Sequence, residues 1–489
     1  MGKIRKVLLT QPSTSWANNR PWSIHPYTLA LLCAIMPDDY ECQALDPNLN
    51  ALTKEDVKAV ISAFAPDVVG ISCISLEFAR SAGMLTAIIK EINPETVIVL
   101  GGVYPTTTPD IALEDPNVDY LILGEGEHRL PKFLEMLNKN DYNFSNFDGI
   151  AYKDSSGKVV VNPMTTYIQD LDTLPFPAWD KLDFLKYANK VDRFSNIFLP
   201  LKYPYTIMST SRGCPHHCIY CSAHSVSGRA IRFKSAERVL EEIDWLVNDY
   251  GIKEIVFLDD SLIQSRKRFE TILKGLIKRD YDLHWKSGNL STFLLDDALL
   301  ELMKESKTYQ LILPIESGNQ DVLTRLIKKP LNLKQVPGIM KKARELGLEV
   351  IADFIIGIPG ETWDQIRDTV TFADEMNADI VNFHIATPVP TTELYSMAKE
   401  QNVLIDGFDF RKFEFFGFAH GCIKTNEFSP EILHSLRAFE WDRINFKTQA
   451  KRETFARING ITIEELNAWS KKTIQNAGLY WPETDKALK

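Results

Sequence analysis

Three cysteines lie close together in the run Ser211-Arg-Gly-Cys-Pro-His-His-Cys-Ile-Tyr-Cys-Ser222, where Cys214, Cys218 and Cys221 have the spacing C-x3-C-x2-C. Cysteine thiolates are the usual ligands of iron–sulfur clusters, and a 4Fe-4S cluster takes about one ligand for each iron. Three thiolates therefore leave one iron without a protein ligand. We expect a 4Fe-4S cluster whose open iron binds a small, reactive molecule.

A zinc site is the alternative for the same residues. His216, His217 and His224 lie near the cysteines, and three cysteines with one histidine form a reasonable zinc ligand set. Compact zinc sites, however, usually take their ligands in pairs from two separated stretches of chain. The spacing therefore favours the iron–sulfur cluster.

The elements that must position this loop are strands and helices that alternate along the second half of the chain. β-Branched and apolar runs predict strands, and 3.6-residue periodicity predicts the helices between them. Six such repeats are typical of a partial (β/α) barrel, whose chemistry lies at the carboxyl ends of its strands. The predicted strands are residues 205–209, 254–258, 284–288, 310–315, 349–356 and 380–385, and the predicted helices are 236–250, 267–279, 297–305, 333–346 and 363–376.

Polar residues and glycines follow each of these strands, where the barrel would gather them around one mouth. Any single one can be an ordinary cap or turn, but all six strand ends share this character. They are Cys214 to Cys221, Asp259-Asp260, Asn289, Glu316-Ser317-Gly318, Gly357 to Glu361 and Thr387-Pro388.

The first part of the chain also alternates strands and helices, which predicts a doubly wound, Rossmann-like parallel sheet. The expected strands are 4–10, 67–73, 96–100 and 120–123, with helices at 55–65, 78–92 and 130–137. Ligands of such sheets bind outside the carboxyl ends of the strands. Ser72, Gly101-Gly102 and Gly124-Glu125-Gly126 fall there, although a glycine pair after a strand is often only a turn.

The composition and length suggest several domains of an ordinary globular chain. The 489 residues carry a net charge of −10, which argues against a nucleic-acid-binding surface. No secretory signal and no membrane-spanning apolar stretch is present, so we expect a cytoplasmic protein. We expect domains at residues 1–140, 201–400 and 401–489, with a proline-bearing connector at 141–200.

Two further expectations concern cysteines and the tail. The scattered Cys33, Cys42, Cys73 and Cys422 are expected to be free thiols. The region after residue 400 is predicted to be mostly helical, with a long amphipathic stretch over 431–455 whose basic face is expected to be solvated. That face carries Arg437, Arg443, Lys447, Lys451 and Arg452.

The cysteine loop, with Glu316-Ser-Gly318 and Phe354-Ile-Ile-Gly-Ile-Pro-Gly-Glu361 at later strand ends, resembles the motifs of radical S-adenosylmethionine (radical SAM) enzymes. The N-terminal domain, with Gly101-Gly102 and Leu123-Gly-Glu-Gly-Glu127, resembles the cobalamin-binding domain of their cobalamin-dependent branch. Ile315 to Leu333 is similar in particular to the fosfomycin-pathway methyltransferase of that branch. One departure is Thr391, where relatives often carry glycine.

The resemblance implies that the cluster cysteines bind iron and that the open iron binds SAM. Tyr220 would place its ring near the adenine, and Glu316 and Ser317 would make polar contacts to SAM. Gly357 and Gly360 would let the backbone approach, Ile358 would contact the adenine, and Gly318 belongs to the same set of SAM residues. Asp259, Asp260 and Asn289 would face the same mouth, toward SAM or substrate.

For the N-terminal domain the resemblance implies cobalamin without a histidine on cobalt. Mutase-type cobalamin domains carry Asp-x-His-x-x-Gly, whereas Asp46-Pro-Asn-Leu-Asn50 has no histidine. Leu76 would lie beneath the corrin. The other residues implied to line the cofactor are Ser72, Ser75, Gly101, Gly102, Val103, Tyr104, Gly124, Glu125 and Gly126.

The hypothesis is therefore a cobalamin-dependent radical SAM C-methyltransferase, in which a deoxyadenosyl radical abstracts hydrogen from an unactivated carbon and methylcobalamin supplies the methyl group. Its expected partners are an electron donor for the cluster and a small biosynthetic intermediate or a peptide residue as substrate. The alternatives are a cobalamin-binding radical SAM enzyme that cyclises or rearranges its substrate, and a non-catalytic iron–sulfur or zinc protein.

Overall fold

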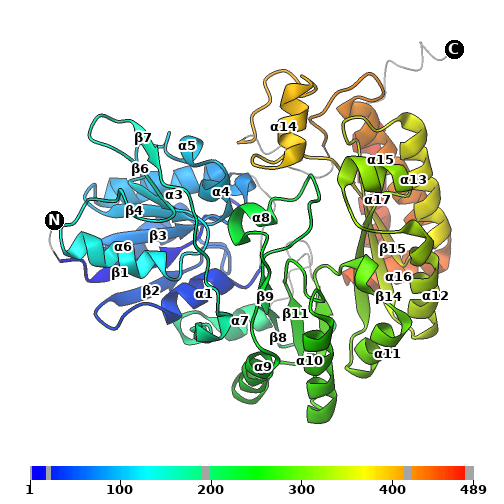
Figure 1. Ribbon diagram of the computed structural model, residues 1–489, viewed down its shortest axis with the longest axis horizontal. Helices are drawn as coiled ribbons and strands as arrows, with labels where there is room; N and C mark the ends of the chain where they lie inside the picture. Colours follow the sequence, from blue (N-terminus) through cyan, green and yellow to red (C-terminus); the bar gives the residue numbers. More distant parts are fainter. Residues whose placement is uncertain (1–2, 18–23, 190–198, 412–419, 479–489) are drawn as a thin grey trace. The chain divides into compact units, whose positions relative to one another are not determined.

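The chain forms two compact units in the computed structural model, which describes residues 3–17, 24–189, 199–411 and 420–478. The first unit comprises residues 1–196, 212–214 and 223–238, and the second comprises 197–211, 215–222 and 239–489. In Figure 1 the ribbon is coloured along the sequence, from blue at the N-terminus to red at the C-terminus. Residues 190–198 of the expected connector and 479–489 of the expected helical region lie outside the described residues.

The first unit contains a seven-stranded sheet in the order β2-β1-β3-β4-β5-β6-β7. The first five strands of that order pair in parallel, and β6 and β7 extend the sheet in the antiparallel sense. β6 and β7 arise from the stretch after residue 140 in which no strand was predicted. The strands are β1 Lys6–Thr10, β2 Glu41–Leu45, β3 Val68–Ser72, β4 Val97–Gly101, β5 Tyr120–Ile122, β6 Ile150–Lys153 and β7 Val159–Val161.

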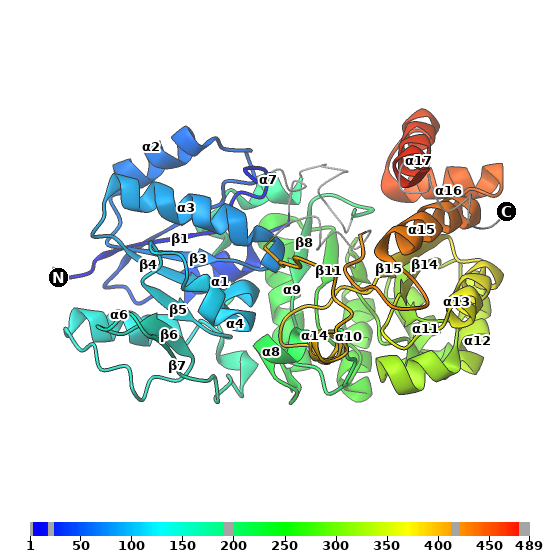
Figure 2. The same ribbon diagram turned by 90° about the horizontal axis from the view of Figure 1, so that it is seen from above.

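Helices cover both faces of this sheet, as the doubly wound prediction requires. Side chains of α1 (Tyr27–Ala34) and α6 (Arg129–Asn138) pack on β1, β3, β4 and β5 in one apolar core. In Figure 2, α2 (Lys54–Phe64) and α3 (Ala79–Ile92) lie side by side on the other side of the strands. The shorter helices are α4 Val103–Thr107, α5 Pro109–Ala112, α7 Phe184–Ala188 and α8 Ala223–Ser227. Two short strands, β9 Ser211–Arg212 and β10 Arg232–Phe233, pair with each other.

The second unit is a partial barrel made of the six strands predicted from the sequence. They form two parallel groups, β12-β11-β8 and β13-β14-β15, which a parallel bridge between Trp285 and Thr308 joins. The strands are β8 Tyr205–Met208, β11 Glu254–Phe257, β12 His284–Ser287, β13 Gln310–Glu316, β14 Glu349–Ile356 and β15 Ile380–Ile385. The helices are α9 Ala236–Tyr250, α10 Arg266–Arg279, α11 Asp297–Glu305, α12 Val336–Glu345 and α13 Trp363–Met376.

The C-terminal region is mostly helical, as predicted, and the amphipathic stretch 431–455 is interrupted once. The structure has two helices there, α15 (Pro430–Asn445) and α16 (Gln449–Asn459), because the Thr448 hydroxyl accepts the Lys451 N–H and begins a new helix. α14 (Glu393–Glu400) precedes them and α17 (Ile463–Gly478) follows. α15 runs along β15 in both views (Figures 1 and 2) and carries α17 on its other side.

α15 covers the free edge of the barrel sheet. The Asn445 amide accepts a hydrogen bond from Val381 N at 2.8 Å and donates one to Val381 O at 2.8 Å. Arg437 Nε donates to Phe383 O at 2.6 Å. Backbone groups at a sheet edge otherwise need water or another strand, so α15 completes the hydrogen bonding of β15.

The expectation that the basic face of the tail is solvated is wrong for Arg437 and Lys451, whereas Arg443 and Lys447 are exposed as expected. Arg437 is bound to β15, and burial lowers its pKa to about 10. Lys451 Nζ donates to Ala378 O at 2.6 Å, and Arg443 and Lys447 each pair with Asp374 at 2.7 Å. These cations attach the tail to the barrel, a role that composition alone does not reveal.

The described residues include no helix long and apolar enough to cross a membrane. Cys33, Cys73 and Cys422 are buried thiols and Cys42 is half-buried, as expected for cysteines outside disulfides.

Candidate active site and cofactor-binding loops

The middle of the cysteine loop is fixed by backbone hydrogen bonds within the second unit. Ile219 N donates to Ile327 O at 3.1 Å, and Ile219 O accepts Leu394 N at 2.9 Å. Cys221 N donates to Cys218 O at 3.2 Å, which closes a turn between the two cysteines. The Cys218 and Cys221 thiols are half-buried, so they remain accessible to a cluster.

Tyr220, between these cysteines, binds a carboxylate at a neighbouring strand end. Its hydroxyl donates to Glu316 Oε1 at 2.5 Å, and Lys329 Nζ donates to the same oxygen at 2.9 Å. Burial, together with the Glu316 charge, raises the pKa of Tyr220 well above its usual value. Glu316 and Lys329 are both buried, so Lys329 compensates the charge of Glu316. The sequence reasoning did not find Lys329.

Ser317 and Gly318 attach the β13 end to α13. The buried Ser317 hydroxyl lies 3.0 Å from Thr369 Oγ1, and Gly318 N donates to Thr369 Oγ1 at 3.1 Å. A Cβ at Gly318 would lie 2.5 Å from Phe372 Cβ. These two residues therefore set the position of Glu316.

A buried glutamate shapes the turn after β14. Glu361 Oε2 accepts hydrogen bonds from Gly357 N at 2.7 Å and Ile358 N at 3.1 Å. Burial raises the pKa of Glu361 to about 7. Gly357 has φ +86°, and a Cβ there would lie 2.4 Å from Leu433 Cδ1. Gly357 and Ile358 thus belong to a turn that is organised from inside the protein.

Asp259 holds the end of β8. Its Oδ1 accepts hydrogen bonds from Thr210 N at 3.0 Å, Thr210 Oγ1 at 2.8 Å and Ser211 Oγ at 2.5 Å. Its Oδ2 is buried and makes no hydrogen bond within the described part of the chain. Burial raises the pKa of this carboxyl. Asn289 forms a local turn in which Ser287 Oγ donates to its carbonyl at 2.6 Å.

Three polar side chains of β14 and β15, missed from the sequence, share one face of the barrel sheet. Asp353 and Asn382 are register partners, and Asn382 Nδ2 donates to Asp353 Oδ1 at 2.9 Å. His384 Nε2 lies 3.7 Å from the same oxygen. The alternate residues Phe354 and Phe383 are fully buried, whereas these three are half-buried. Polar residues at every second position of apolar strands were the sequence signal.

In the first unit, the carboxyl ends of β3 and β4 form a tight backbone cradle. Gly102 has φ +94°, and a Cβ there would lie 2.6 Å from Cys73 O. Tyr104 N donates to the same Cys73 O at 3.2 Å, and Cys73 N donates to Gly101 O at 2.8 Å. The glycine at position 102 is therefore required for this approach of the two loops.

The next residues of the predicted cobalamin set lie in the same region. Ser72 Oγ is buried at the end of β3 and makes no hydrogen bond to any described residue. Ser75 Oγ accepts the Glu77 N–H at 3.3 Å and caps the short helix Leu76–Phe78, in which Leu76 is buried. Val103 begins α4 directly after the cradle.

Gly124, Glu125 and Gly126 follow β5 but differ in surroundings. Gly124 has φ +68°, its N–H donates to Thr106 Oγ1 at 2.9 Å, and a Cβ there would meet the Met164 side chain. Gly126 has space for ordinary contact with Leu32. The Glu125 carboxylate is buried and bound by arginine, so its side chain has a protein partner.

Cys214 belongs to the first unit, unlike Cys218 and Cys221, the other two cysteines predicted to bind the cluster. Its N–H donates to Gly228 O at 3.3 Å. Gly213 before it has φ +87°, and a Cβ there would lie 2.6 Å from Ala230 O. The chain around Cys214 is thus held against residues 228–230.

No three His, Cys, Asp or Glu side chains of the described chain are grouped to hold a single metal ion. For the zinc alternative, His216 Nε2 lies 3.1 Å from Gln264 Oε1, and its ring packs edge-on against Phe293. The half-buried thiols suit iron–sulfur ligation, and the glycine cradle with the orphaned Ser72 hydroxyl suits a bound cofactor at the first sheet.

Two family models match the chain. Residues 208–373 match the radical SAM superfamily, and residues 17–134 match the B12 binding domain. These ranges contain all three cluster cysteines and all the residues predicted to bind SAM or cobalamin.

Several relatives cover most of the chain. An uncharacterised methyltransferase of Pyrococcus horikoshii is 33% identical over 82% of this chain and 85% of its own length. The cytidylyl-2-hydroxyethylphosphonate methyltransferase of Streptomyces wedmorensis is 31% identical over 80% and 81%. The anaerobic magnesium-protoporphyrin IX monomethyl ester cyclase of Rubrivivax gelatinosus is 30% identical over 76% of this chain and 65% of the cyclase.

A solved structure confirms the predicted fold. TsrM from Kitasatospora setae, a radical SAM methyltransferase with cobalamin and a 4Fe-4S cluster bound, aligns with a TM-score of 0.72 over 97% of this chain and 99% of TsrM, at 16% identity. The cofactors of this chain are accordingly a 4Fe-4S cluster, SAM and cobalamin. The chain belongs to the cobalamin-dependent radical SAM enzymes, in the branch that contains the methyltransferases.

Proposed function

We propose that this enzyme transfers a methyl group to an unactivated carbon of a small biosynthetic intermediate. The observation that carries the proposal is the presence, in one chain, of the fixed cysteine loop with Tyr220 and Glu316 and of the cobalamin-type sheet edge with the Gly102 cradle. When bound, SAM on the reduced cluster supplies a radical that takes hydrogen from carbon, and methylcobalamin supplies the methyl group.

The protein's own task is to position these groups and exclude water. In this proposal the SAM site contains Tyr220, Glu316, Ser317, Gly318, Gly357 and Ile358. Some of these residues would shape the site and not only contact SAM, because the Ser317 hydroxyl and the Gly357 and Ile358 N–H groups already have protein partners. Tyr220 and Glu316, joined to Lys329, give the site a charge-balanced polar wall.

For cobalamin, the proposed residues are Ser72, Ser75, Leu76, Gly101, Gly102, Val103, Tyr104, Gly124, Glu125 and Gly126. The absence of histidine from Asp46 to Asn50 supports cobalt without a protein histidine from this loop. Asp46 is itself engaged, because its Oδ2 accepts the Tyr187 hydroxyl at 2.7 Å. Glu125 contributes through its backbone, since arginine binds its carboxylate.

The substrate is proposed to meet Asp353, Asn382 and His384. This group offers a carboxylate, an amide and an imidazole on one half-buried sheet face. Such a set suits a substrate with hydroxyl or amine groups, which can donate to Asp353. A peptide residue, such as a glutamine of methyl-coenzyme M reductase, is the second substrate class in this proposal.

The test uses reconstituted enzyme with SAM carrying a deuterated methyl group and whole-cell extracts, which contain both metabolites and proteins, from a strain that lacks the gene. Methyl transfer predicts deoxyadenosine, S-adenosylhomocysteine and one metabolite heavier by the labelled methyl group. Deoxyadenosine together with a changed but unmethylated metabolite would contradict the proposal and favour an enzyme that cyclises or rearranges its substrate. The similarity to the cyclase of Rubrivivax gelatinosus is the reason for testing this alternative. Labelled protein in place of a labelled metabolite would select the peptide substrate.

A further inference from the structure

Two arginines and two glutamates of the first unit connect the loop after β5 to the segments that flank the cluster cysteines. Arg232, in β10, donates from Nη1 to Glu125 Oε1 at 2.6 Å. Arg212, in β9, forms an ion pair with Glu127 and lies 3.4 Å from Glu125 Oε1. Because β9 and β10 pair with each other, the two arginines approach the same loop from adjacent strands.

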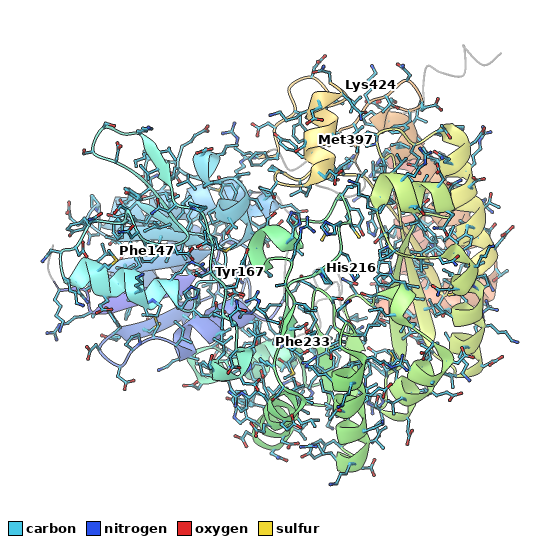
Figure 3. The ribbon with its side chains drawn as sticks, viewed as in Figure 1. Phe147, Tyr167, His216, Phe233, Met397 and Lys424 are labelled. Atoms are coloured by element: carbon cyan, nitrogen blue, oxygen red, sulfur yellow. The ribbon has the colours of Figure 1, made fainter. Side chains whose placement is uncertain are left out.

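Further contacts fix the arginine and glutamate side chains. Arg232 Nη1 also donates to Ile168 O at 2.8 Å, and its Nη2 donates to Ser227 O at 2.6 Å. Glu125 Oε2 accepts Ile168 N at 2.8 Å. The Tyr167 ring, labelled in Figure 3, lies 5.0 Å from the Arg232 guanidinium and would be 2.9 Å from a Cβ at Gly228.

These two arginines and two glutamates are largely buried, and their positive and negative charges balance. The side chains of Arg232 and Glu125 are each 4% exposed, and those of Arg212 and Glu127 are 17% and 10% exposed. Burial raises the pKa of Glu127, but the charge and hydrogen bond of Arg212 outweigh it, so the pKa lies below its usual value. Removal of either partner would leave a buried charge uncompensated, which costs far more than loss of an exposed pair.

The two arginines and two glutamates lie close in sequence to residues proposed for both cofactor sites. Glu125 and Glu127 flank Gly126 in the loop proposed to line cobalamin. Arg212 is two residues before Cys214, whose N–H donates to Gly228 O, and Gly228 follows α8. α8 begins after Cys221 and packs against α4, the helix that starts at the Gly102 cradle.

We propose that Arg212 and Glu127 are positioning residues that couple occupancy of the cobalamin site to occupancy of the iron–sulfur site. In this proposal, bound cobalamin restricts the motion of the loop after β5. The ion pairs of Glu125 and Glu127 with the two arginines then restrict the backbone next to Cys214. Coupling between two sites is reciprocal, so the cluster must strengthen cobalamin binding by the same factor. The inference rests on the proposed placement of cobalamin at the loop after β5.

The test measures the dissociation constant of hydroxocobalamin by absorbance for the full chain, both with its cluster and after removal of iron by chelation. Wild-type protein should bind more tightly with the cluster than without it, by a factor within the usual range of about 5 to 150. Arg212→Gln and Glu127→Gln should each bring this ratio close to one, and Arg212→Lys should restore part of it. The matched control is Arg266→Gln, which removes an exposed ion pair with Asp296 in the second unit and should leave the ratio unchanged.

The outcomes separate the inference from the proposed function. If wild-type protein does not bind cobalamin at all, the proposed function fails. If wild-type protein binds cobalamin with the same affinity in both iron states, or if the ratio survives in both Arg212→Gln and Glu127→Gln, the coupling is wrong. Should Arg212→Gln fail to fold, Glu127→Gln decides alone, because it removes the charge and keeps a hydrogen-bonding side chain of the same length.

Discussion

Burial raises the pKa of Glu361 toward neutral pH, and the hydrogen bonds that it accepts from two backbone N–H groups offset only part of this effect. Its pKa is raised from 4.5 to about 7 by burial. Between these values the folded protein holds a proton that the unfolded chain has released, so folding stability falls as pH rises. The loss attributable to this group is about 3 kcal/mol in total, nearly complete by pH 8.

The measurement is urea unfolding of wild-type protein and Glu361→Gln at pH 5 and pH 8. Wild type should lose more stability than the variant over this interval, because glutamine keeps an acceptor oxygen and cannot ionise. Asp364→Asn, whose side chain is 90% exposed, should keep the wild-type pH dependence. Equal pH dependence in wild type and Glu361→Gln would contradict the assignment.

A second prediction concerns Gly102. Gly102→Ala should weaken retention of cobalamin and lower stability by about 1–3 kcal/mol, because its Cβ would lie 2.6 Å from Cys73 O and the two loops must move apart. Gly157→Ala is the matched control, since Gly157 also has positive φ, +82°, but has no atom within 4 Å of the added Cβ. Absorbance of bound cobalamin and thermal unfolding measure both effects. Equal losses in the two variants would show that backbone strain, and not the close approach, matters.

For single residues, the sequence predicts which side chains belong to the site better than it predicts the contacts that those side chains make. Spacing predicts Cys214, Cys218 and Cys221 as cluster ligands, but it does not predict that Tyr220 binds Glu316 or that Lys329 compensates the charge of Glu316. Tyr220 and Glu316 are 96 positions apart and Glu316 and Lys329 are 13 apart, and no local pattern encodes either contact. Thr391, noted as a departure from glycine, adopts φ +73°, so the backbone keeps the conformation that glycine would favour.

Among the helices and strands, α15 covers the edge of β15, and Asn445 of α15 makes two hydrogen bonds to the backbone of that strand. Asn445→Ala should lower the free energy of unfolding by about 2–4 kcal/mol, because Val381 N and Val381 O would both lose their partner in a buried place. Asn467→Ala removes an exposed amide that accepts from Arg452 and should change stability by less than about 0.5 kcal/mol. Urea unfolding compares them. A small effect at Asn445 would mean that water replaces the amide.

The predictability of the elements follows their burial. Most of the six barrel strands and of the four strands predicted for the first sheet are rich in apolar residues, which the sequence pattern reveals, although β12, with His284 and Lys286, is not. β2 was not predicted because its residues, Glu41 to Leu45, are mostly exposed or half-buried and lack a β-branched run. The basic residues of the tail look solvated in sequence, yet Arg437 binds β15, because binding to a distant carbonyl leaves no trace in the local pattern.

For the whole molecule, the discontinuous composition of the first unit predicts how the chain opens. Residues 223–238 belong to the first unit although they lie between strands β8 and β11 of the barrel. Cooperative units exchange their amide hydrogens together as denaturant is added. Amides of residues 228–233 should therefore exchange in step with β1 and β3 and not with β8 and β11. Exchange in step with the barrel strands would contradict this division of the chain.

The interleaved segments also limit how such enzymes can be recombined. A chimaera that joins the N-terminal part of one relative to the barrel of another at a single junction would keep Glu125 and Glu127 but replace the chain around Arg212 and Arg232. It would then combine a buried acidic pair with foreign counter-ions. A workable exchange must carry residues 212–214 and 223–238 together with the N-terminal sheet and leave 215–222 with the barrel. Cys218 and Cys221 are thus inherited from one parent, while Cys214 and the residues on either side of this loop come from the other.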